Sequence, residues 1–336
     1  MPDLDVLQKK IEAFQRQVFK TTGARNRAIE RVLMQSYREA LAAAMKEMQK
    51  LYEKAGATKV VDGISITKAD AARRGMLDKR IANIKSEMKA LEKKGIKLTA
   101  AASQQNFQNA YYGAQWATSK GLGFKVGFDL LPVDAIRAAV YSDSSGLTFI
   151  KTFIKNTLAN QAKTQATIVR GITQGWSFPK MAKEVKDRFT NSMSDSLRVM
   201  RTEVTRCYTQ GQLEAHRQAL ALGIIVKKKW VVTKDDRLRD AHEPLDGVFE
   251  DENGLFWIEG FSAEGPGLFG VPKLDINERC TIEDVLQELP SDIEDNIGTQ
   301  PIAGFTEWAK DHGWVDGTGW PKIESTANQI DKASRG

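Results

Sequence analysis

The sequence predicts an α+β protein that is predominantly α-helical, with an elongated N-terminal helical region and a small C-terminal domain that mixes helices with a β-hairpin. Apolar residues recur three or four positions apart over most of roughly the first 220 residues, which is the spacing of one helix face. The first convincing strand follows them, at 224–233. Strands that come after helices, instead of alternating with them, indicate α+β rather than α/β architecture.

The composition is that of an ordinary globular protein. The 336 residues are 41% hydrophobic and 27% charged, and this length favours two or three domains over one core. No apolar run approaches the roughly 18 residues of a membrane span, and the first thirty residues hold no signal-peptide core. Cys207 and Cys280 are too few for a disulfide framework, so we expect a soluble chain made in a reducing cytoplasm.

Residues 1–145 are expected to form a helical arm or bundle. An apolar stripe from Leu4 to Val18 predicts a first helix, and a second stripe over 29–51 follows a turn-like segment at 21–23. A small hairpin is expected near 60–66, where an Asp-Gly pair supplies the turn. The next helix is expected to begin near Thr67 and Asp70, to run through the apolar stripe at 77–91 and to end near Gly95. Plain packing and partner binding explain these stripes equally well.

A domain boundary is predicted in the polar run 142–146, and residues 146–290 are expected to form the second domain. Helices lie on both sides of this boundary, and a hairpin comes near the end of the domain. The expected helices are 106–116, 133–140, 147–170, 179–189 and 191–223, and the hairpin joins 248–249 to 255–258 about a turn at 251–254.

Residues 291–336 form an acidic tail that contains Trp308, Trp314 and Trp320 and one expected helix at 305–312. Exposed tryptophans in a weakly structured tail need a surface to pack on. They dock either on the protein's own body or on a partner, as apolar anchors in a groove. The sequence leaves both alternatives open.

Charge is divided unevenly along the chain. Residues 1–240 hold 43 basic and 23 acidic residues, whereas 241–336 hold 6 and 20. This division favours a basic part that faces a polyanion such as nucleic acid and an acidic part that faces a different partner. Long helices with lysine and arginine on solvated faces would give the same counts, so both interpretations stand.

Reactive side chains are densest between Asp235 and Gly247. His242 could act there as a general base, with Asp236 among the carboxylates that could orient it and Arg237 and Arg239 to hold an anion. The alternative is a structural network in which arginine–aspartate pairs and the histidine hold a loop together. Because no second nucleophile accompanies the cluster, the structural network is favoured.

Other kinds of site have less support. His242 and Cys280 are single ligands 38 residues apart, whereas zinc sites usually have Cys or His in close pairs. The sequence contains neither a phosphate-binding glycine loop nor a Gly-x-Ser-x-Gly elbow. We therefore assign no catalytic residue, cofactor site or metal site, and enzymatic activity is not expected.

A wider pattern surrounds the cluster: Arg-Thr-Glu on a long helix, a tryptophan in the strand, the cluster itself and an Asn-x-Arg-Cys segment. Its residues are Arg201, Thr202, Glu203, Gly211, Ala215, Trp230, Asp236, Arg237, Arg239, His242, Leu245, Asp246, Gly247, Asn277, Arg279 and Cys280. Over about residues 150–285 this pattern resembles the phage head-morphogenesis family typified by the F protein of phage Mu.

Many members of that family carry a cysteine in the Arg-x-x-His stretch and a Cys-x-Cys at the end, which could form a metal or disulfide site. This sequence keeps only Cys280 of the final pair, so a four-ligand zinc site is not expected. Instead, we expect hydrogen bonds and ion pairs to hold the loop. The residues expected in that network are Arg201, Glu203, Asp236, Arg239, His242 and Asp246.

The resemblance implies a non-enzymatic minor head protein of a tailed phage or prophage, associated with the portal vertex or capsid interior and assisting head assembly and DNA packaging or ejection. Its partners would be the portal protein, the major capsid protein or both, and packaged double-stranded DNA through the basic N-terminal part; no membrane partner is expected. The expected location is the virion, after assembly in the host cytoplasm.

Two alternatives stay open. Some proteins of the broader family are fused to enzymatic domains, so one alternative is a nucleic-acid-processing enzyme, a nuclease or transferase centred on His242, Asp236 and Arg239. The other is a stand-alone DNA-binding protein.

Overall fold

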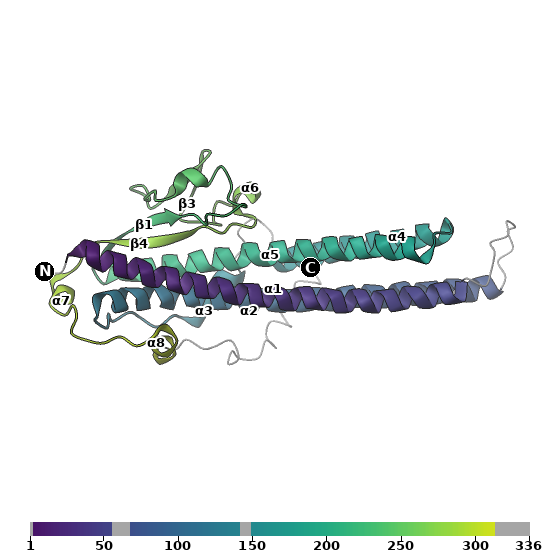
Figure 1. The fold of residues 1–336 in the computed structure, drawn as a ribbon, viewed down its shortest axis with the longest axis horizontal. Helices are drawn as coiled ribbons and strands as arrows, with labels where there is room; N and C mark the ends of the chain where they lie inside the picture. The colour runs from purple at the N-terminus through teal and green to yellow at the C-terminus, as the bar shows by residue number, and fades with distance from the viewer. Residues whose placement is uncertain (1–2, 56–67, 142–148, 313–336) are drawn as a thin grey trace. The chain divides into compact units, whose positions relative to one another are not determined.

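A computed structural model describes residues 3–55, 68–141 and 149–312 of the chain (Figure 1). They belong to two compact units, each assembled from separate stretches of sequence. Unit 1 comprises Met1–Ala28, Thr99–Phe149 and Val199–Gly336, and unit 2 comprises Ile29–Leu98 and Ile150–Arg198. The hairpin expected near 60–66 and the boundary expected at 142–146 lie outside the described residues, so the division at 145 and 290 stays a prediction.

Long helices dominate, and the predicted fold class, a predominantly helical α+β protein, is confirmed. The long helices are α1 (Leu4–Ala55), α2 (Lys68–Leu122), α4 (Phe149–Thr173) and α5 (Phe178–Ala221). The short ones are α3 (Val133–Tyr141), α6 (Pro272–Asp275), α7 (Ser291–Glu294), α8 (Phe305–Asp311) and the 3₁₀ turn η1 (Glu243–Leu245). Within the described ranges no helix is both long and apolar enough to span a bilayer.

Three predicted helix ends are wrong, because the helices continue through them. Helix α1 runs through 21–23, α2 runs through Gly95, and α5 joins the two helices expected at 179–189 and 191–223. A glycine inside a helix costs about 1 kcal/mol relative to alanine, which packing readily offsets. At Gly95 a Cβ would lie 2.6 Å from the ring of Phe153, so the missing side chain makes room for this aromatic contact.

Unit 2 is built in its described part from segments of α1, α2, α4 and α5 around one apolar core. Polar contacts also hold the helices against one another: the buried Tyr37 hydroxyl lies 2.7 Å from the Ser196 hydroxyl, and Arg80 pairs with Glu47 at 2.8 Å. The core residues include Leu33, Ala40, Ala44, Met48, Ile81, Ile84, Met88, Leu91, Phe153, Ile168, Met181, Val185 and Phe189.

In unit 1, helices α2 and α5 approach closely at Gly211. A Cβ at this position would lie 2.2 Å from the carbonyl oxygen of Phe107, a distance that no side chain tolerates. Because only glycine fits there, Gly211 sets how near the two helix backbones come.

Helix α3 ends against a buried arginine of α5. Arg206, only 1% exposed, donates to the carbonyl oxygens of Ala139 at 2.8 Å and Val140 at 3.3 Å, and it pairs with Glu203 at 2.8 Å. These carbonyls belong to the last turn of α3, which has no basic residue of its own. The guanidinium therefore provides hydrogen-bond donors for the last carbonyl groups of α3 and places a positive charge at the negative end of the helix dipole.

Two small antiparallel sheets complete the described part of unit 1. Strand β1 (Ile225–Val231) pairs with β4 (Thr281–Glu288), and β2 (Phe256–Ile258) pairs with β3 (Phe261–Ala263). Strand β1 lies within the segment predicted for it, whereas β4 is not predicted by the sequence analysis.

The predicted hairpin is wrong in its partner. The segment at 255–258 pairs with β3 rather than with 248–249, and Phe249 instead forms an isolated bridge with Lys229 of β1. The turn between β2 and β3 consists of Glu259 and Gly260, with φ values of 50° and 84°. Two successive residues with positive φ are typical of the type I′ turn that closes tight hairpins.

The N-terminal part of α1 is bound by polar contacts to the sheet formed by β1 and β4. Arg16 pairs with Glu283 at 2.8 Å, Lys229 pairs with Glu12 at 2.6 Å, and the backbone N–H of Leu286 donates to the Gln8 side chain at 2.7 Å. Although Glu283 is buried, its charge is thus balanced by an arginine and a lysine from two different elements.

The segment before α8 runs along the end of α2. The Gly298 N–H donates to the carbonyl of Leu122 at 2.9 Å, and Trp116 Nε1 donates to the carbonyl of Ala303 at 3.0 Å. Trp308 of α8 is 4% exposed. For Trp308 the structure thus shows packing on the protein's own body. Partner docking by Trp314 and Trp320, which lie outside the described residues, stays a prediction.

Candidate functional site

Trp230 of β1 stands at the centre of the β region of unit 1. Its fully buried ring lies edge-on to Phe256 and His242, with centroids 5.2 and 6.0 Å away, and is tilted against Phe269 at 6.1 Å. The residues packed around it come from α5, from both sheets and from the loops between them. They include Leu213, Val232, Leu245, Ile258, Ala263, Leu274, Cys280 and Ile282.

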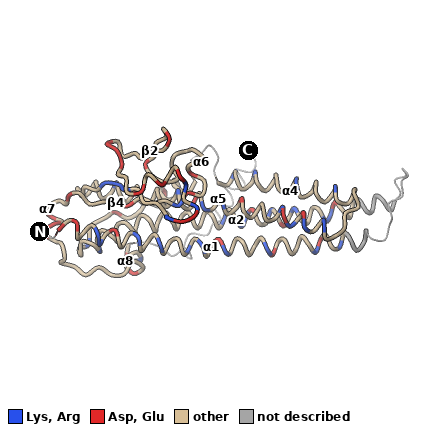
Figure 2. The backbone as a smooth tube through the Cα atoms, turned by 45° about the horizontal axis from the view of Figure 1, so that its top comes forward, with Lys and Arg blue, Asp and Glu red and all other residues tan. Residues whose placement is uncertain are grey.

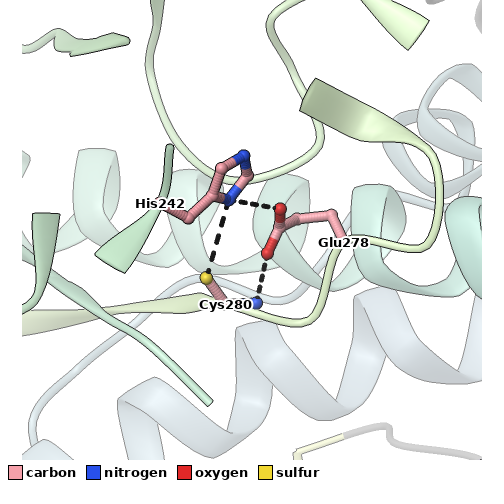
Figure 3. Close-up of side chains that lie close together, drawn as sticks. All are labelled: His242, Glu278 and Cys280. Atoms are coloured by element: carbon pink, nitrogen blue, oxygen red, sulfur yellow. Dashed lines mark hydrogen bonds and ion pairs between the residues drawn. The ribbon is translucent and has the colours of Figure 1, made fainter. Parts of the chain in front are cut away.

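His242, Glu278 and Cys280 converge, as Figure 3 shows, and the ring of His242 contacts that of Trp230. His242 is 1% exposed and the other two are 3% exposed. The Nδ1 atom of His242 lies 2.5 Å from Oε2 of Glu278 and 3.8 Å from the sulfur of Cys280. The other oxygen of Glu278 accepts the backbone N–H groups of Cys280 at 2.6 Å and Arg279 at 2.7 Å.

Arg239 completes the cluster. Its Nη1 atom donates to Oε2 of Glu278 at 3.1 Å and to the carbonyl oxygen of Leu274 at 2.9 Å, and its Nη2 atom donates to the carbonyl oxygen of Ile276. The carboxylate of Glu278 thus has four contacts, which match the acceptor sites of an ionised carboxylate. It connects the loop after β1 to the start of β4.

The environment favours the charged form of Glu278. Burial alone would raise its pKa, but the hydrogen bond and charge of His242, together with the N–H of Cys280, outweigh burial and hold the pKa below its ordinary value. The thiol of Cys280 responds in the opposite way, since burial and the charge of Glu278 both raise its pKa. Cys280 is therefore a neutral thiol rather than a nucleophilic thiolate.

These three residues are of types that bind Zn²⁺, and one ligand atom of each lies within 4.8 Å of the others. Bond lengths of about 2.0–2.3 Å hold the ligand atoms of a tetrahedral zinc roughly 3.3 Å or more apart. The 2.5 Å between His242 and Glu278 is instead a hydrogen-bond distance, and Arg239 adds positive charge beside it. The arrangement fits a hydrogen-bonded cluster, and these side chains would have to separate to hold a metal.

Neither cavity beside the cluster is lined by all three residues of the proposed enzyme centre, His242, Asp236 and Arg239. His242 and Arg239 line a cavity of about 10 Å³, which is room for one water molecule. A hollow of about 460 Å³ is lined by other residues of the loop, including Lys234 and Glu243. Asp236 lines neither space, and its side chain is 92% exposed.

Further motif residues hold the edges of the loop. Arg279 pairs with Asp235, while Asp246 pairs with Lys234 at 2.8 Å and accepts the N–H of Val232 at 3.2 Å. The hydrogen bond from Lys234 outweighs burial and lowers the pKa of Asp246. The exposed Arg237 lies 3.5 Å from the carboxylate of Asp235.

Leu245 and Gly247 anchor the end of the loop. Leu245 is buried in the core around Trp230, and the N–H of Gly247 donates to the carbonyl oxygen of Trp230 at 2.8 Å.

Helix α5 holds the segment before β4 through two threonines. The Thr202 hydroxyl accepts the N–H of Asn277 at 3.0 Å, and the Thr205 hydroxyl donates to the carbonyl oxygen of Glu278 at 2.8 Å. Asn277 has a φ of 57°, a left-handed conformation that asparagine tolerates better than most residues. Arg201, on the same helix, is partly exposed.

The composition expected for the loop network is wrong. Arg239 and His242 do meet, but on Glu278, whereas Asp246 pairs with Lys234. Glu203 does not join the loop network, because it pairs with the buried Arg206 three residues further along the same helix face.

A second buried charge cluster was missed by the sequence analysis. Nδ1 of His216 on α5 lies 2.6 Å from Asp284 of β4, and its Nε2 lies 4.0 Å from Glu250. Glu250 also pairs with the buried Lys228 of β1 at 3.1 Å, and Lys228 stands opposite Asp284 in the strand register. Burial alone would lower the pKa of His216, but the hydrogen bond and charge of Asp284 and the charge of Glu250 outweigh burial and raise it.

Comparison with known proteins finds a family match for the part of the chain that contains the buried cluster. Residues 162–283 match the family described as Phage Mu protein F like protein. Over 318 residues the chain is 24% identical to a protein of Enterococcus faecalis (strain ATCC 700802 / V583) named NAD(+)--arginine ADP-ribosyltransferase EFV. That alignment covers 93% of this chain but only 61% of the relative, so the chain spans about three fifths of the relative's length.

No solved structure matches the chain. The family match encloses every motif residue from Arg201 to Cys280, including the buried cluster around Trp230. Residues 162–283 of this chain are therefore similar to the phage Mu protein F like family, the resemblance that the motif residues predict.

Proposed function

We propose that the chain is a minor head protein of a tailed phage or prophage, associated with the portal vertex or capsid interior, where it assists head assembly and DNA packaging or ejection. The observation that carries the proposal is the family match over residues 162–283. The partners in this proposal are the portal protein, the major capsid protein or both.

The geometry of the motif supports a structural role. Arg239 and His242 both contact the carboxylate of Glu278, Arg239 and Glu278 also bond to backbone groups, and the cavity beside them holds no more than a water molecule. Side chains arranged in this way fix the loop after β1 against β4, and they do not reach a substrate. We therefore propose that the protein is not an enzyme.

Quantitative mass spectrometry of purified heads tests the role in the virion. Cells that express the neighbouring head genes would supply the particles, and the chain would be counted against the portal protein. A low and reproducible ratio is expected, and the Asp236→Ala variant, altered at an exposed position, is expected to give the same ratio. Heads that lack the chain while it remains in the lysate would contradict the proposal.

The name of the relative favours a second candidate, an ADP-ribosyltransferase that acts on arginine. We propose that the named activity belongs to the two fifths of the relative that this chain does not match. The test incubates the full chain with labelled NAD⁺ and an arginine-containing acceptor, with the Enterococcus faecalis protein as the positive control. Label transferred by this chain would overturn the assignment.

Nuclease activity is tested separately. The full chain is incubated with DNA and RNA in the presence of divalent metal ions and compared with Asp236→Ala, whose exposed side chain can be removed without disturbing the core. No cleavage is expected from either protein. Cleavage by the parent chain that the substitution abolishes would favour the enzyme centred on His242, Asp236 and Arg239.

A further inference from the structure

We propose that the exposed face of helix α4 in unit 2 binds the phosphate backbone of double-stranded DNA. The inference rests on the proposed function in one respect: DNA is chosen because it is the polyanion that a head protein meets. The location of the surface comes from the distribution of charge in the structure.

Unit 2 holds the excess positive charge of the chain. Its sequence contains 25 basic and 12 acidic residues, whereas that of unit 1 contains 24 and 31. Within unit 2 the stretch 150–182, which covers α4 after its first residue and the start of α5, has five basic residues and no acidic one. Figure 2 shows basic positions along α4 without an acidic one between them.

The cations of α4 share one face. Successive helical residues are about 100° apart around the axis, which places the four cations within an arc of about 120°. All four are exposed: Lys151, Lys155, Lys163 and Arg170. The charge of α4 thus points to solvent along a single surface instead of being spread around the helix.

Three small side chains lie among these cations, and the exposed Val169 lies at the edge of the arc. Ala159, Ala162 and Ala166 fall within the same arc and are exposed. Because alanine projects little beyond the helix backbone, a nucleic-acid strand can approach closely enough for the flanking lysines to reach its phosphates.

In the described part of the chain, no carboxylate pairs with Lys155, Lys163 or Arg170 on this face. Among the described residues Lys155 and Lys163 have no ion-pair partner, and Arg170 lies over the ring of Trp176 at 5.0 Å from its centroid. Elsewhere in unit 2, by contrast, Arg80 pairs with Glu47 and Lys89 pairs with Glu92. Unpaired cations such as Lys155 and Lys163 bind a polyanion with release of its counterions.

The chemistry of the face fits double-stranded rather than single-stranded DNA. Proteins that bind single strands usually stack bases on exposed aromatic rings. The aromatic residue at this end of α4, Trp176, is covered by Arg170 and by Lys180, whose Nζ atom lies 4.4 Å from the ring centroid. Cations and alanines provide phosphate contacts without base readout, so binding is expected to be independent of sequence.

The test measures binding of the full chain to a labelled duplex of random sequence between about 50 and 200 mM salt. The triple variant Lys155→Gln/Lys163→Gln/Arg170→Gln is expected to bind roughly 10- to 100-fold more weakly at the lowest salt. The slope of log affinity against log salt should fall in magnitude by about 2 to 3, close to one for each lost phosphate contact. The variant Lys155→Arg/Lys163→Arg should bind like the parent chain.

The matched control removes the same charge from unit 1. Lys9, Lys10 and Lys20 of α1 are exposed, and the variant Lys9→Gln/Lys10→Gln/Lys20→Gln is expected to keep the parent's affinity and salt slope. Thermal melts followed by circular dichroism check that both triple variants are folded. Equal losses of DNA affinity in the two variants would show that only net charge matters, and they would overturn the assignment. A parent chain that does not bind DNA would also overturn it.

Incorporation into heads is a separate measurement that distinguishes this inference from the proposed function. A parent chain that enters heads, together with a triple variant that binds DNA as tightly as the parent, overturns the DNA surface and leaves the head-protein proposal standing. A triple variant that binds DNA normally but no longer enters heads assigns the α4 face to a protein partner, which also overturns the inference.

Discussion

Glu278 is the residue on which the loop after β1 depends, and its removal should be costly. Glu278→Ala would leave the guanidinium of Arg239 without its carboxylate and two backbone N–H groups without acceptors. Breaking a buried charged pair in this way typically costs about 3–5 kcal/mol. We expect the free energy of unfolding, measured by urea titration, to fall by an amount in this range.

Asp236→Ala provides the comparison for Glu278. Its carboxylate is 92% exposed and lies 3.9 Å from Arg237, so the free energy of unfolding should change by no more than about 0.5 kcal/mol. A loss at Asp236 as large as that at Glu278 would contradict the structural role assigned to the buried cluster.

His216 should make stability depend on pH. Its pKa is raised in the folded protein by Asp284 of β4 and Glu250, against burial and the charge of Lys228 on β1. Its contribution to stability is therefore fully present below its ordinary pKa of 6.5 and is lost as the pH rises through the folded-state value.

The variant His216→Gln tests this dependence. Urea unfolding between about pH 6 and 9 should show a decline in the parent chain that is smaller in the variant. Parallel curves for the two proteins would show that His216 does not titrate between the folded and unfolded states as described.

Part of the buried cluster could be predicted from the sequence, and part could not. His242, Arg239 and Cys280 stand out as reactive types near one strand, and the structure brings them together around Trp230. Their shared partner, Glu278, has no periodic or spacing signal; it stands two residues before Cys280 as one carboxylate among many. Which carboxylate Arg239 takes depends on the path of the chain, whereas Glu203 and Arg206 pair within one helix, where their spacing alone predicts the contact.

At the scale of elements, the crossing of α2 and α5 gives a sharp test. Gly211→Ala would place a methyl group 2.2 Å from the Phe107 carbonyl oxygen and force the helices apart, so we expect a loss of about 1–3 kcal/mol or more in the free energy of unfolding. Gly127→Ala makes the same chemical change where no atom lies within 4 Å, and it should be tolerated. Chemical denaturation measures the free energy of unfolding of both variants. Similar losses in the two would show that the close approach of the helices is not what requires Gly211.

The sequence predicts where many elements lie but not how far they extend. The helices at 133–140, 147–170 and 305–312 and the strand at 224–233 are close to α3, α4, α8 and β1. Local breaks such as Gly95 mislead, because packing in the folded unit outweighs the small intrinsic cost of glycine in a helix. Strand β4 escapes prediction because Glu283 and Asp284 interrupt its apolar pattern, and their partners Arg16 and His216 are far away in sequence.

At the scale of the whole molecule, charge counted along the sequence and charge counted within each compact unit give different divisions. The sequence separates a basic part ending near residue 240 from an acidic remainder. The structure instead gathers positive charge in unit 2, while unit 1 includes the basic start of α1 together with the acidic C-terminal residues. Lysines near the N-terminus, such as Lys9 and Lys20, therefore belong with the acidic unit, which is why they serve as controls for the α4 face.

The burial of both cysteines has a consequence for the protein outside a living cell. Cys207 and Cys280 are free and buried, and burial raises the pKa of Cys207 to about 11 and that of Cys280 also. Oxidants and alkylating reagents attack exposed thiolates, so neither sulfur is available in the native state. A thiol-reactive dye should label the chain only after denaturation. Under the proposed function, a phage head that contains this chain would therefore carry both thiols into air-saturated surroundings in a form that resists oxidation.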